Sequence, residues 1–300
     1  MVLKAISNSP TISSGAGVPS STPSKVGDIY IDITAKKTYF ATGTTSSADW
    51  TDYSPTVSSN TFKFRITLED PNTVIELPIE DGGNSYLHNF TVSWGDGHTS
   101  TVLSYDDQYR IHTYVLAGTY DIELSGTCEY FNTRNYDIGS YIIELISFVG
   151  DIGFKLLCFR NCDNLDTIVP LGSFVSLTTA KDMFSGCENL LTLPANLFKN
   201  CTQLNTVEAI FSASGLTTIP IDLFKYNTLI DNYVEAFYGC TSLTGHNWGY
   251  PLESGETEQT VTGTIIYNAE QQPIPPSSTG SCFGACPNLT EVELIPAAWL

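Results

Sequence analysis

Hydrophobic and polar residues alternate in two parts of this chain, and a longer repeat then replaces the alternation. The first alternating stretch is short: Ile29, Ile31 and Ile33 are separated by aromatic or polar residues, which predicts a β-strand. Residues 34–37 would turn the chain into a second strand that ends at Phe40. Because a lone hairpin is marginal in water, we expect it either to use a partner surface or to fold as a small subdomain on the next domain.

A longer alternating region covers residues 61–135. Apolar residues occupy every second position from Phe62 to Leu68, which predicts a strand with one buried and one solvated face. Gly95-Asp96-Gly97 is a tight-turn signal. Five or more short strands at this spacing favour an antiparallel β-sandwich. The other alternating segments are 90–94, 109–114 and 119–124.

The sequence repeats itself from residue 159 onward. In one register of the repeat, the pattern Phe-x-x-Cys-x-x-Leu recurs, and a shorter copy at Phe211 has Ser214 in place of the cysteine. Successive copies are 25, 27, 26 and 46 residues apart, and an interleaved Leu/Ile-Pro motif recurs after 26 residues. A period near 26 is typical of leucine-rich repeats, in which stacked coils align their apolar residues into one core. The complete copies in this register begin at Phe159, Phe184, Phe237 and Phe283.

The charge balance restricts the partners. Lys and Arg total 13 against 32 acidic residues, a net charge of −19, which argues against nucleic acid and anionic membranes as partners. No window approaches the length of an apolar membrane span, so we expect no membrane insertion. The first fifteen residues contain no apolar signal segment, so we expect no secretory leader.

Charge and composition also divide the chain. Residues 1–60 have no net charge and are nearly half Gly, Pro, Ser and Thr, whereas residues 61–140 and 141–300 carry −8 and −11. We therefore predict a mainly β protein with three parts: an N-terminal arm with a β-hairpin as attachment module (1–60), an antiparallel Ig-like β-sandwich (61–140), and a leucine-rich-repeat solenoid (141–300).

The N-terminal segment resembles a known module. The run from Gly17 through Gly27-Asp-Ile-Tyr-Ile-Asp, continuing to Asp49-Trp50, is similar to a short module repeated in bacteriophage tail-fibre and other virion fibre proteins. The resemblance covers about 35 residues. It implies that the arm attaches the chain to other virion proteins.

The middle region resembles the PKD family of immunoglobulin-like domains. The matching segments are Val92-Ser-Trp-Gly-Asp-Gly and the run from His112-Thr-Tyr to Leu124, although Trp94 here directly precedes Gly95. The family implies a spacer or adhesion module and no catalysis. Asp96 is a candidate calcium ligand, but we favour an Asp that hydrogen-bonds the backbone of its own turn.

The C-terminal repeats are similar to BspA-type leucine-rich repeats, whose hallmark is Phe-x-x-Cys-x-x-Leu followed by Ile/Leu-Pro. In this setting the eight cysteines are predicted to be mainly small buried residues. A disulfide is most plausible between Cys128 and Cys158. The spacings Cys158-x-x-x-Cys162 and Cys282-x-x-x-Cys286 would suit zinc, but no histidine lies nearby in sequence, and we predict no metal.

An insertion at about 246–280 interrupts the repeats. Insertions in solenoids form loops on one face, often the binding face. Aromatic rings stack on sugars, so we predict ligand contacts at Trp248, Tyr250, His246 and Tyr238. The alternative is that Trp248 and Tyr250 only cap the last coil.

The sequence contains no catalytic constellation. Four histidines, at positions 88, 98, 112 and 246, are scattered, and no nucleophile motif or phosphate loop accompanies them. We therefore expect no enzyme activity and no cofactor.

These expectations lead to one functional hypothesis with two alternatives. The first is a non-enzymatic phage virion protein, a fibre or decoration protein, that binds host-surface glycan or protein and is located in the virion. The alternatives are a bacterial cell-surface adhesin built from the same modules, and a purely structural capsid or tail component. Whether it is a homo-oligomer stays open, because no heptad or triple-helix pattern is present.

Overall fold

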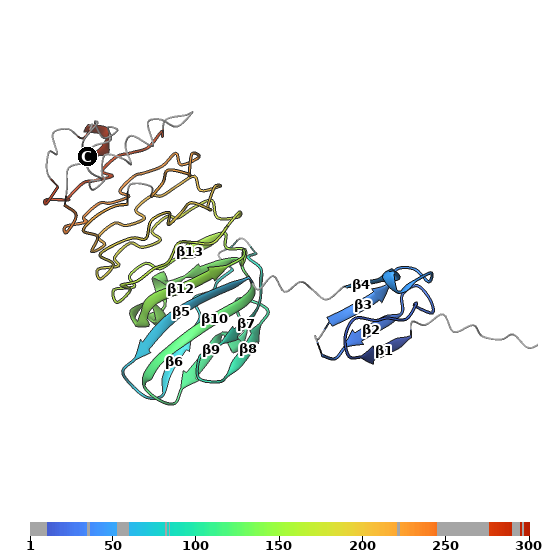
Figure 1. The fold of residues 1–300 in the computed structure, drawn as a ribbon. Coiled ribbons are helices and arrows are strands. Elements are labelled where there is room, and N and C mark those ends of the chain that lie inside the picture. Colours follow the sequence, from blue (N-terminus) through green and yellow to red (C-terminus); the bar gives the residue numbers. More distant parts are fainter. Residues whose placement is uncertain are drawn as a thin grey trace, which may run out of the picture. The chain divides into compact units, whose positions relative to one another are not determined.

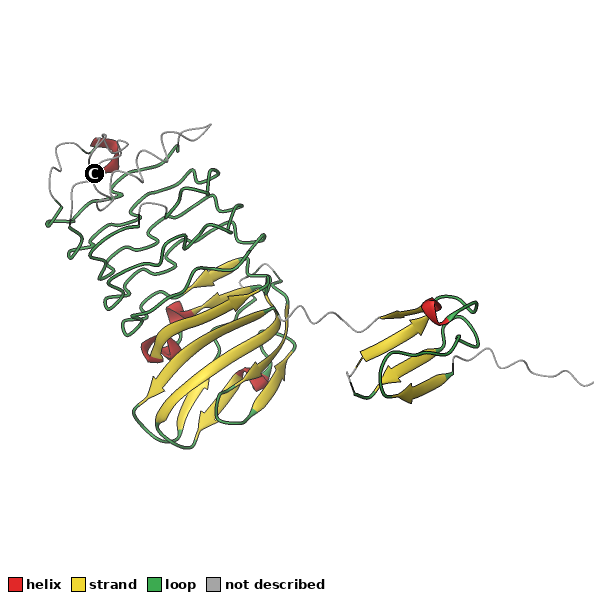
Figure 2. Cartoon of the chain, in the orientation of Figure 1, coloured by secondary structure: helices red, strands yellow, loops and turns green. Residues whose placement is uncertain are grey.

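The computed structural model describes residues 11–34, 37–52, 60–81, 83, 85–220, 223–244, 276–289, 295 and 297–300. The chain is mainly β (Figure 1, Figure 2). It divides into two compact units, Met1–Ser58 and Ser59–Leu300, which are described here separately.

The first unit contains a four-stranded sheet in the order β1-β2-β3-β4. The predicted hairpin is confirmed, since β2 and β3 pair antiparallel with Ile29 opposite Phe40. It does not stand alone, because β1 adds parallel to β2 and β4 adds antiparallel to β3. The elements are β1 (Ile12–Gly15), β2 (Ile29–Asp32), β3 (Lys37–Ala41), the 3-10 helix η1 (Ser47–Asp49) and β4 (Trp50–Asp52).

The buried face of this sheet is not the isoleucine face. Ile31 and Ile33 are 39% and 65% exposed, whereas Asp28 and Asp32 are 4% and 2% exposed. The carboxylates are buried because loop groups donate to them: Asp28 accepts from Thr11 N at 2.8 Å, Lys25 N at 3.0 Å and the Ser24 hydroxyl. Asp32 accepts from the amides of residues 17 and 34.

The C-terminal Asp-Trp pair of the fibre-like motif has a similar role. Asp49 accepts from the backbone amides of Thr45 and Ser46 and closes the turn into η1. The Trp50 indole donates to Ser21 O at 2.8 Å and its ring packs beside Tyr30. The residues that define this motif therefore hold its loops in place.

The second unit begins with a five-stranded antiparallel sheet in the order β12-β5-β10-β7-β8. A second, two-stranded antiparallel sheet pairs β6 with β9, and β11 pairs parallel with β13. The strands are β5 (Thr61–Leu68), β6 (Thr73–Glu76), β7 (His88–Ser93), β8 (Thr99–Val102), β9 (Ile111–Tyr114), β10 (Gly118–Cys128), β11 (Tyr130–Asn132), β12 (Ile142–Val149) and β13 (Leu156–Cys158). The 3-10 helices are η2 (Gln108–Arg110), η3 (Thr133–Asn135), η4 (Asp137–Tyr141) and η6 (Ala297–Trp299).

The alternation predicted for the first strand of this unit is confirmed. Every second residue of β5, from Phe62 to Leu68, is buried. The Phe62 ring stacks on Phe148 of β12 at 4.9 Å and meets Phe131 edge-on at 5.4 Å. An aromatic cluster therefore joins β5 to β11 and β12, which lie far from it in sequence.

Strand β12 follows residue 140, where the sequence predicts the boundary between the sandwich and the repeats. It pairs with β5 along its length, with Ile142 opposite Ile66 and Val149 opposite Thr61. The same strand makes the first parallel bridge to the following segments, at Glu144 and Thr167. One continuous apolar core runs through both parts, so the sheet and the repeats are packed together.

We refer to the described residues of 156–244 and 276–289 as the repeat ladder. Successive segments stack, as Figure 1 shows beyond β13. The phenylalanine rings of the repeated motif form a nearly parallel column in which neighbouring centroids are 5.8, 5.6, 5.5 and 5.4 Å apart. The rings are those of Phe159, Phe184, Phe211, Phe237 and Phe283. Parallel bridges follow the column at Leu156, Thr179, Thr206, Asn232 and Ser278.

The cysteines of the motif connect neighbouring segments. The thiol of Cys187 donates to Phe159 O at 3.2 Å, that of Cys240 to Phe211 O at 3.0 Å, and that of Cys286 to Phe237 O at 3.1 Å. All eight cysteines are buried and free, including Cys128 and Cys158. These motif cysteines therefore act as small buried donors to the preceding copy of the repeat.

Candidate functional site

Three of the four predicted contact residues, Trp248, Tyr250 and His246, lie outside the described residues. Tyr238 is described and its residue is 42% exposed. Its ring rests on Gly284 of the next segment, where an added Cβ would approach the ring's Cδ2 to 2.9 Å. Tyr238 therefore leans along the repeat ladder with part of its ring open to solvent.

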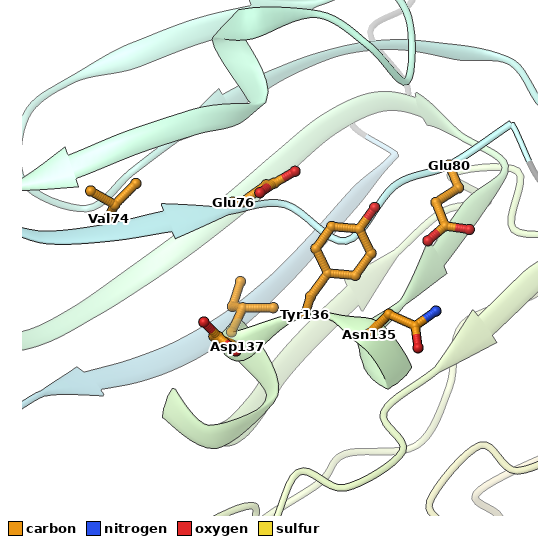
Figure 3. Close-up of a pocket in the computed structure, with 7 residues that line it drawn as sticks. Val74, Glu76, Glu80, Asn135, Tyr136 and Asp137 are labelled. Carbon is orange, nitrogen blue, oxygen red and sulfur yellow. The ribbon is translucent and has the colours of Figure 1, made fainter.

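The described residues contain a polar groove beside β6, with a cavity volume of about 520 Å³. Its residues come from β6, the segment after it, and the η3–η4 connection. Figure 3 shows the Tyr136 ring between Glu76 and Glu80, with Asn135 and Asp137 beside its base. Val74 and Ile138 complete the wall.

The polar groups of this groove are partly paired. Glu76 forms an ion pair with Arg110, and Arg110 also donates to Leu77 O at 3.3 Å. The Tyr136 hydroxyl donates to Ile79 O at 3.3 Å. Glu80 accepts from the Tyr130 hydroxyl at 3.4 Å. Asn135 and Asp137 are exposed, so they are the groups most available to a ligand.

The electrostatics of the groove keep its phenol neutral. Burial, and then the nearby carboxylate of Glu80, raise the pKa of Tyr136 to about 12. A neutral phenol can donate a hydrogen bond but is a poor nucleophile at neutral pH. The groove is therefore suited to binding hydroxyl groups or cationic groups, and it lacks an activated reactive group.

A second polar groove, of about 550 Å³, joins the sheet to the start of the repeat ladder. Its walls carry hydroxyl, amide and carboxylate side chains together with one aromatic ring. These are the groups that hydrogen-bond sugar hydroxyls and stack on sugar faces. The residues include Thr67, Asp70, Tyr141, Asn164, Asp166 and Asn189.

The asparagines of this second groove belong to the repeat. Asn164 and Asn189 each follow a motif cysteine by two residues, and Asn288 has the same place in the last copy. Asn164 donates its amide to Ser140 O at 2.7 Å, and Asn288 donates to Thr241 O at 2.7 Å. Each of these two side chains contacts the preceding segment and remains exposed at the surface.

The groups most often used in catalysis have structural partners here. Burial raises the pKa of all eight thiols, to about 12 for Cys158 and Cys201, so none is poised as a thiolate. His88 is buried, with its Nε2 3.2 Å from Glu80 O, and burial lowers its pKa. His112 is stacked on Trp94.

The interpretation of Asp96 as a turn residue agrees with the structure. Its Oδ1 accepts from the backbone amide of His98 at 3.0 Å, as in an Asx turn. His112 Nε2 lies 2.7 Å from the other carboxylate oxygen.

The two grooves were not predicted from the sequence. Glu76, Glu80 and Tyr136 are separated by up to sixty residues and come together only through the packing of η4 beside β6. The second groove had a detectable signal, since Asn164 and Asn189 recur at the repeat period.

Comparison of the chain with protein-family models, curated proteins and solved structures finds no match. In the part of the chain that the structure describes, no helix has the length and hydropathy of a membrane span.

Proposed function

We propose that this protein is a non-enzymatic structural protein of a bacteriophage virion, a fibre or decoration protein that binds a host surface. The observation that carries the proposal is the state of the cysteines. Eight buried thiols, several of them donating to repeat carbonyls, suit a protein that folds and assembles in reducing cytosol. A secreted adhesin of this cysteine content would mature where thiols are oxidised.

The architecture we propose is a fibre-like module, a PKD-like sandwich and a BspA-type solenoid. Parallel bridges and a phenylalanine column in the repeat ladder support the solenoid. The sandwich is supported by Trp94, the buried residue that follows β7. Its carbonyl accepts from the Tyr114 hydroxyl of β9 at 2.7 Å, and β7 and β9 belong to different sheets.

Recognition is proposed on the repeat ladder. Tyr238, which is partly exposed, would contact the ligand together with Trp248, Tyr250 and His246. The second polar groove, which contains Asn164 and Asn189, supplies a further polar surface. A surface of net charge −19 favours neutral glycans or basic protein partners. Attachment to other virion proteins is assigned to the N-terminal unit.

Two other functions remain as alternatives. A bacterial surface adhesin would use the same modules, and a purely structural capsid or tail component would use no receptor. Mass spectrometry of purified phage particles separates the first alternative from a virion protein. Thiol titration of the denatured protein without reductant is expected to count six or more free thiols, and a count of four or fewer would contradict the observation on which the proposal depends.

Adsorption separates a receptor-binding protein from a purely structural one. The double variant Trp248→Ala, Tyr250→Ala is expected to melt near the wild-type temperature and to lose host adsorption. Tyr226→Ala is the matched control, because Tyr226 is a 40% exposed tyrosine of the same ladder. A double variant that melts normally and adsorbs at wild-type strength would remove the proposed site. If Trp248 only caps the last coil, Trp248→Ala should instead cost about 3 kcal/mol or more.

A further inference from the structure

The turn between β7 and β8 holds a carboxylate and an imidazole close together. Gly95 and Gly97 have φ values of +82° and +95°, a conformation that favours glycine, and the turn is closed by a hydrogen bond from Trp94 N to His98 O at 3.0 Å. Asp96 and His98 therefore extend from one rigid turn. The Asp96 carboxylate is 17% exposed and the His98 side chain is 72% exposed.

A second imidazole reaches the same carboxylate from β9. His112 Nε2 lies 2.7 Å from Asp96 Oδ2, and its side chain is 14% exposed. The ring is fixed on two sides: it stacks on Trp94 with centroids 4.8 Å apart and meets Tyr114 edge-on at 4.7 Å. This imidazole is held in place whether or not His98 takes part.

The third group completes a triangle of possible ligand atoms. His98 Nδ1 lies 3.2 Å from Asp96 Oδ1, and the three ligand atoms lie within 4.8 Å of one another. Zinc bonds of about 2.0–2.2 Å in a tetrahedral site place ligand atoms roughly 3.4 Å apart. A small rotation of the exposed His98 side chain would bring the group to that spacing. Among the described residues, no other group of histidine, cysteine and acidic side chains meets at such distances.

We propose that Asp96, His98 and His112 form a binding site for a divalent transition-metal ion of the zinc, cobalt and nickel class. Two imidazoles and one carboxylate are ligands that such ions prefer, whereas calcium takes six to eight oxygen ligands and finds one carboxylate here. His112 is held by stacking on Trp94, and Asp96 by its hydrogen bond from the His98 amide, so both are in place before the ion binds. The exposed His98 side chain then rotates to bind the ion. The fourth position is open to water or to a ligand from another molecule. The site does not depend on the proposed virion function.

If these three residues have a purely structural role, the His98 side chain is not needed, whereas metal binding requires it. The pairing of His112 with Asp96, and the stacking on Trp94, require no second imidazole. The His98 backbone amide supports the turn, and this contact survives replacement of its side chain. Removing the His98 side chain therefore separates metal binding from the packing of the turn.

The experiment uses the full chain without an affinity tag, after treatment with a chelator. Co²⁺ is titrated and its visible absorption is followed, and Zn²⁺ binding is measured by calorimetry with the melting temperature as a second readout. His98→Ala is the test variant, and Thr99→Ala, at the exposed first residue of β8, is the matched control. A metal that binds the folded state raises the melting temperature with its concentration.

The wild-type chain and Thr99→Ala are expected to bind one ion per chain and to melt at higher temperature with Zn²⁺. His98→Ala should melt like the wild type without metal and bind at least tenfold more weakly. Equal affinity of His98→Ala and wild type, or weak binding of several ions without a defined stoichiometry, would overturn the proposal.

Discussion

The two compact units bury different chemistry beneath their sheets. Among the described residues of the first unit, the buried apolar side chains are Tyr39, Ala41 and two prolines, and the carboxylates of Asp28 and Asp32 are buried with them. The second unit buries a continuous set of phenylalanine, leucine, isoleucine and cysteine side chains. A unit of fewer than sixty residues has little apolar area to bury. In the first unit, hydrogen bonds from loop amides to the carboxylates therefore supply part of the stabilisation that apolar burial gives the second unit.

The comparison also explains why similar sequence patterns behave differently. Alternation in β5 places Phe62 and Phe64 inside, whereas alternation in β2 places Ile31 outside and Asp32 inside. Both strands alternate with a period of two. Periodicity alone therefore identifies a strand but does not determine which of its two faces is buried. In β2 the buried face is set by backbone donors on the carboxylate side, which come from residues 11 and 17 at the two ends of β1 and from Lys25.

The largest effect is expected when one ring is removed from the phenylalanine column of the second unit, which tests whether that column is a packed core. Phe184 stacks between Phe159 and Phe211, and Phe184→Ala should lower the free energy of unfolding of the second unit by about 3–5 kcal/mol. Urea unfolding measures the change, with Val175→Ala, at a 63% exposed position, as the control. A loss below about 1 kcal/mol would mean that the column is not a packed core.

The second test concerns a polar residue inside the apolar unit. Asn227 stands where the preceding copy of the interleaved Leu/Ile-Pro motif has Cys201. It is fully buried and donates to Phe198 O at 2.9 Å and to Cys201 O at 2.8 Å. Asn227→Ala leaves both carbonyls without this donor and should cost about 1–3 kcal/mol. Asn227→Cys restores a single donor and should cost less than Asn227→Ala in the same unfolding measurement. The reverse order would show that a single thiol donor does not substitute for the amide at this position.

The third test addresses the carboxylates of the small unit. Hydrogen bonds from Ser24, Thr11 and Lys25 lower the pKa of Asp28 to about 2. Asp28→Asn replaces one accepting oxygen with an amide donor, so amide hydrogen exchange in residues 11–52 of the full chain should accelerate. Exchange in residues 60–244 should not change. Accelerated exchange in both units would contradict independent stabilisation of the small unit.

The same residue predicts an acid dependence. Because its folded-state pKa lies below the ordinary value of 3.8, the contribution of Asp28 to stability is present above about pH 4. It is lost as the pH falls toward about 2. Hydrogen exchange in the small unit should accelerate over that range in the wild type and vary less in Asp28→Asn.

The smallest expected effect concerns His88 in the second unit. Burial lowers its pKa, opposed by the contact with Glu80 O and by the charge of Glu129, and its Nδ1 is buried without a hydrogen-bond partner among the described residues. The unfolded chain then binds the proton more readily, so stability should decline as the pH falls from about 6.5. In His88→Gln this decline should be weaker between about pH 7.5 and pH 5. An unchanged slope would assign the decline to other groups.

Several features of the fold follow from local periodicity and can be predicted from the order of residues alone. These are the β2–β3 hairpin, the alternating strands β5 and β7, and the repeat with its phenylalanine, cysteine and leucine positions. Side chains two residues apart on a strand, or one repeat apart in the ladder, share an environment for reasons of geometry alone. Such positions can be assigned without knowing what packs against them.

The tertiary structure decided the features that require segments distant in sequence to meet. It placed β12 in the sheet next to β5, turned the carboxylate face of β2 inward, and set His112 beside Asp96 and His98. It also formed the grooves beside Tyr136 and Asn164. Each depends on strand partners and loop paths that lower the free energy only when the whole unit is assembled. No local pattern of residues encodes that choice.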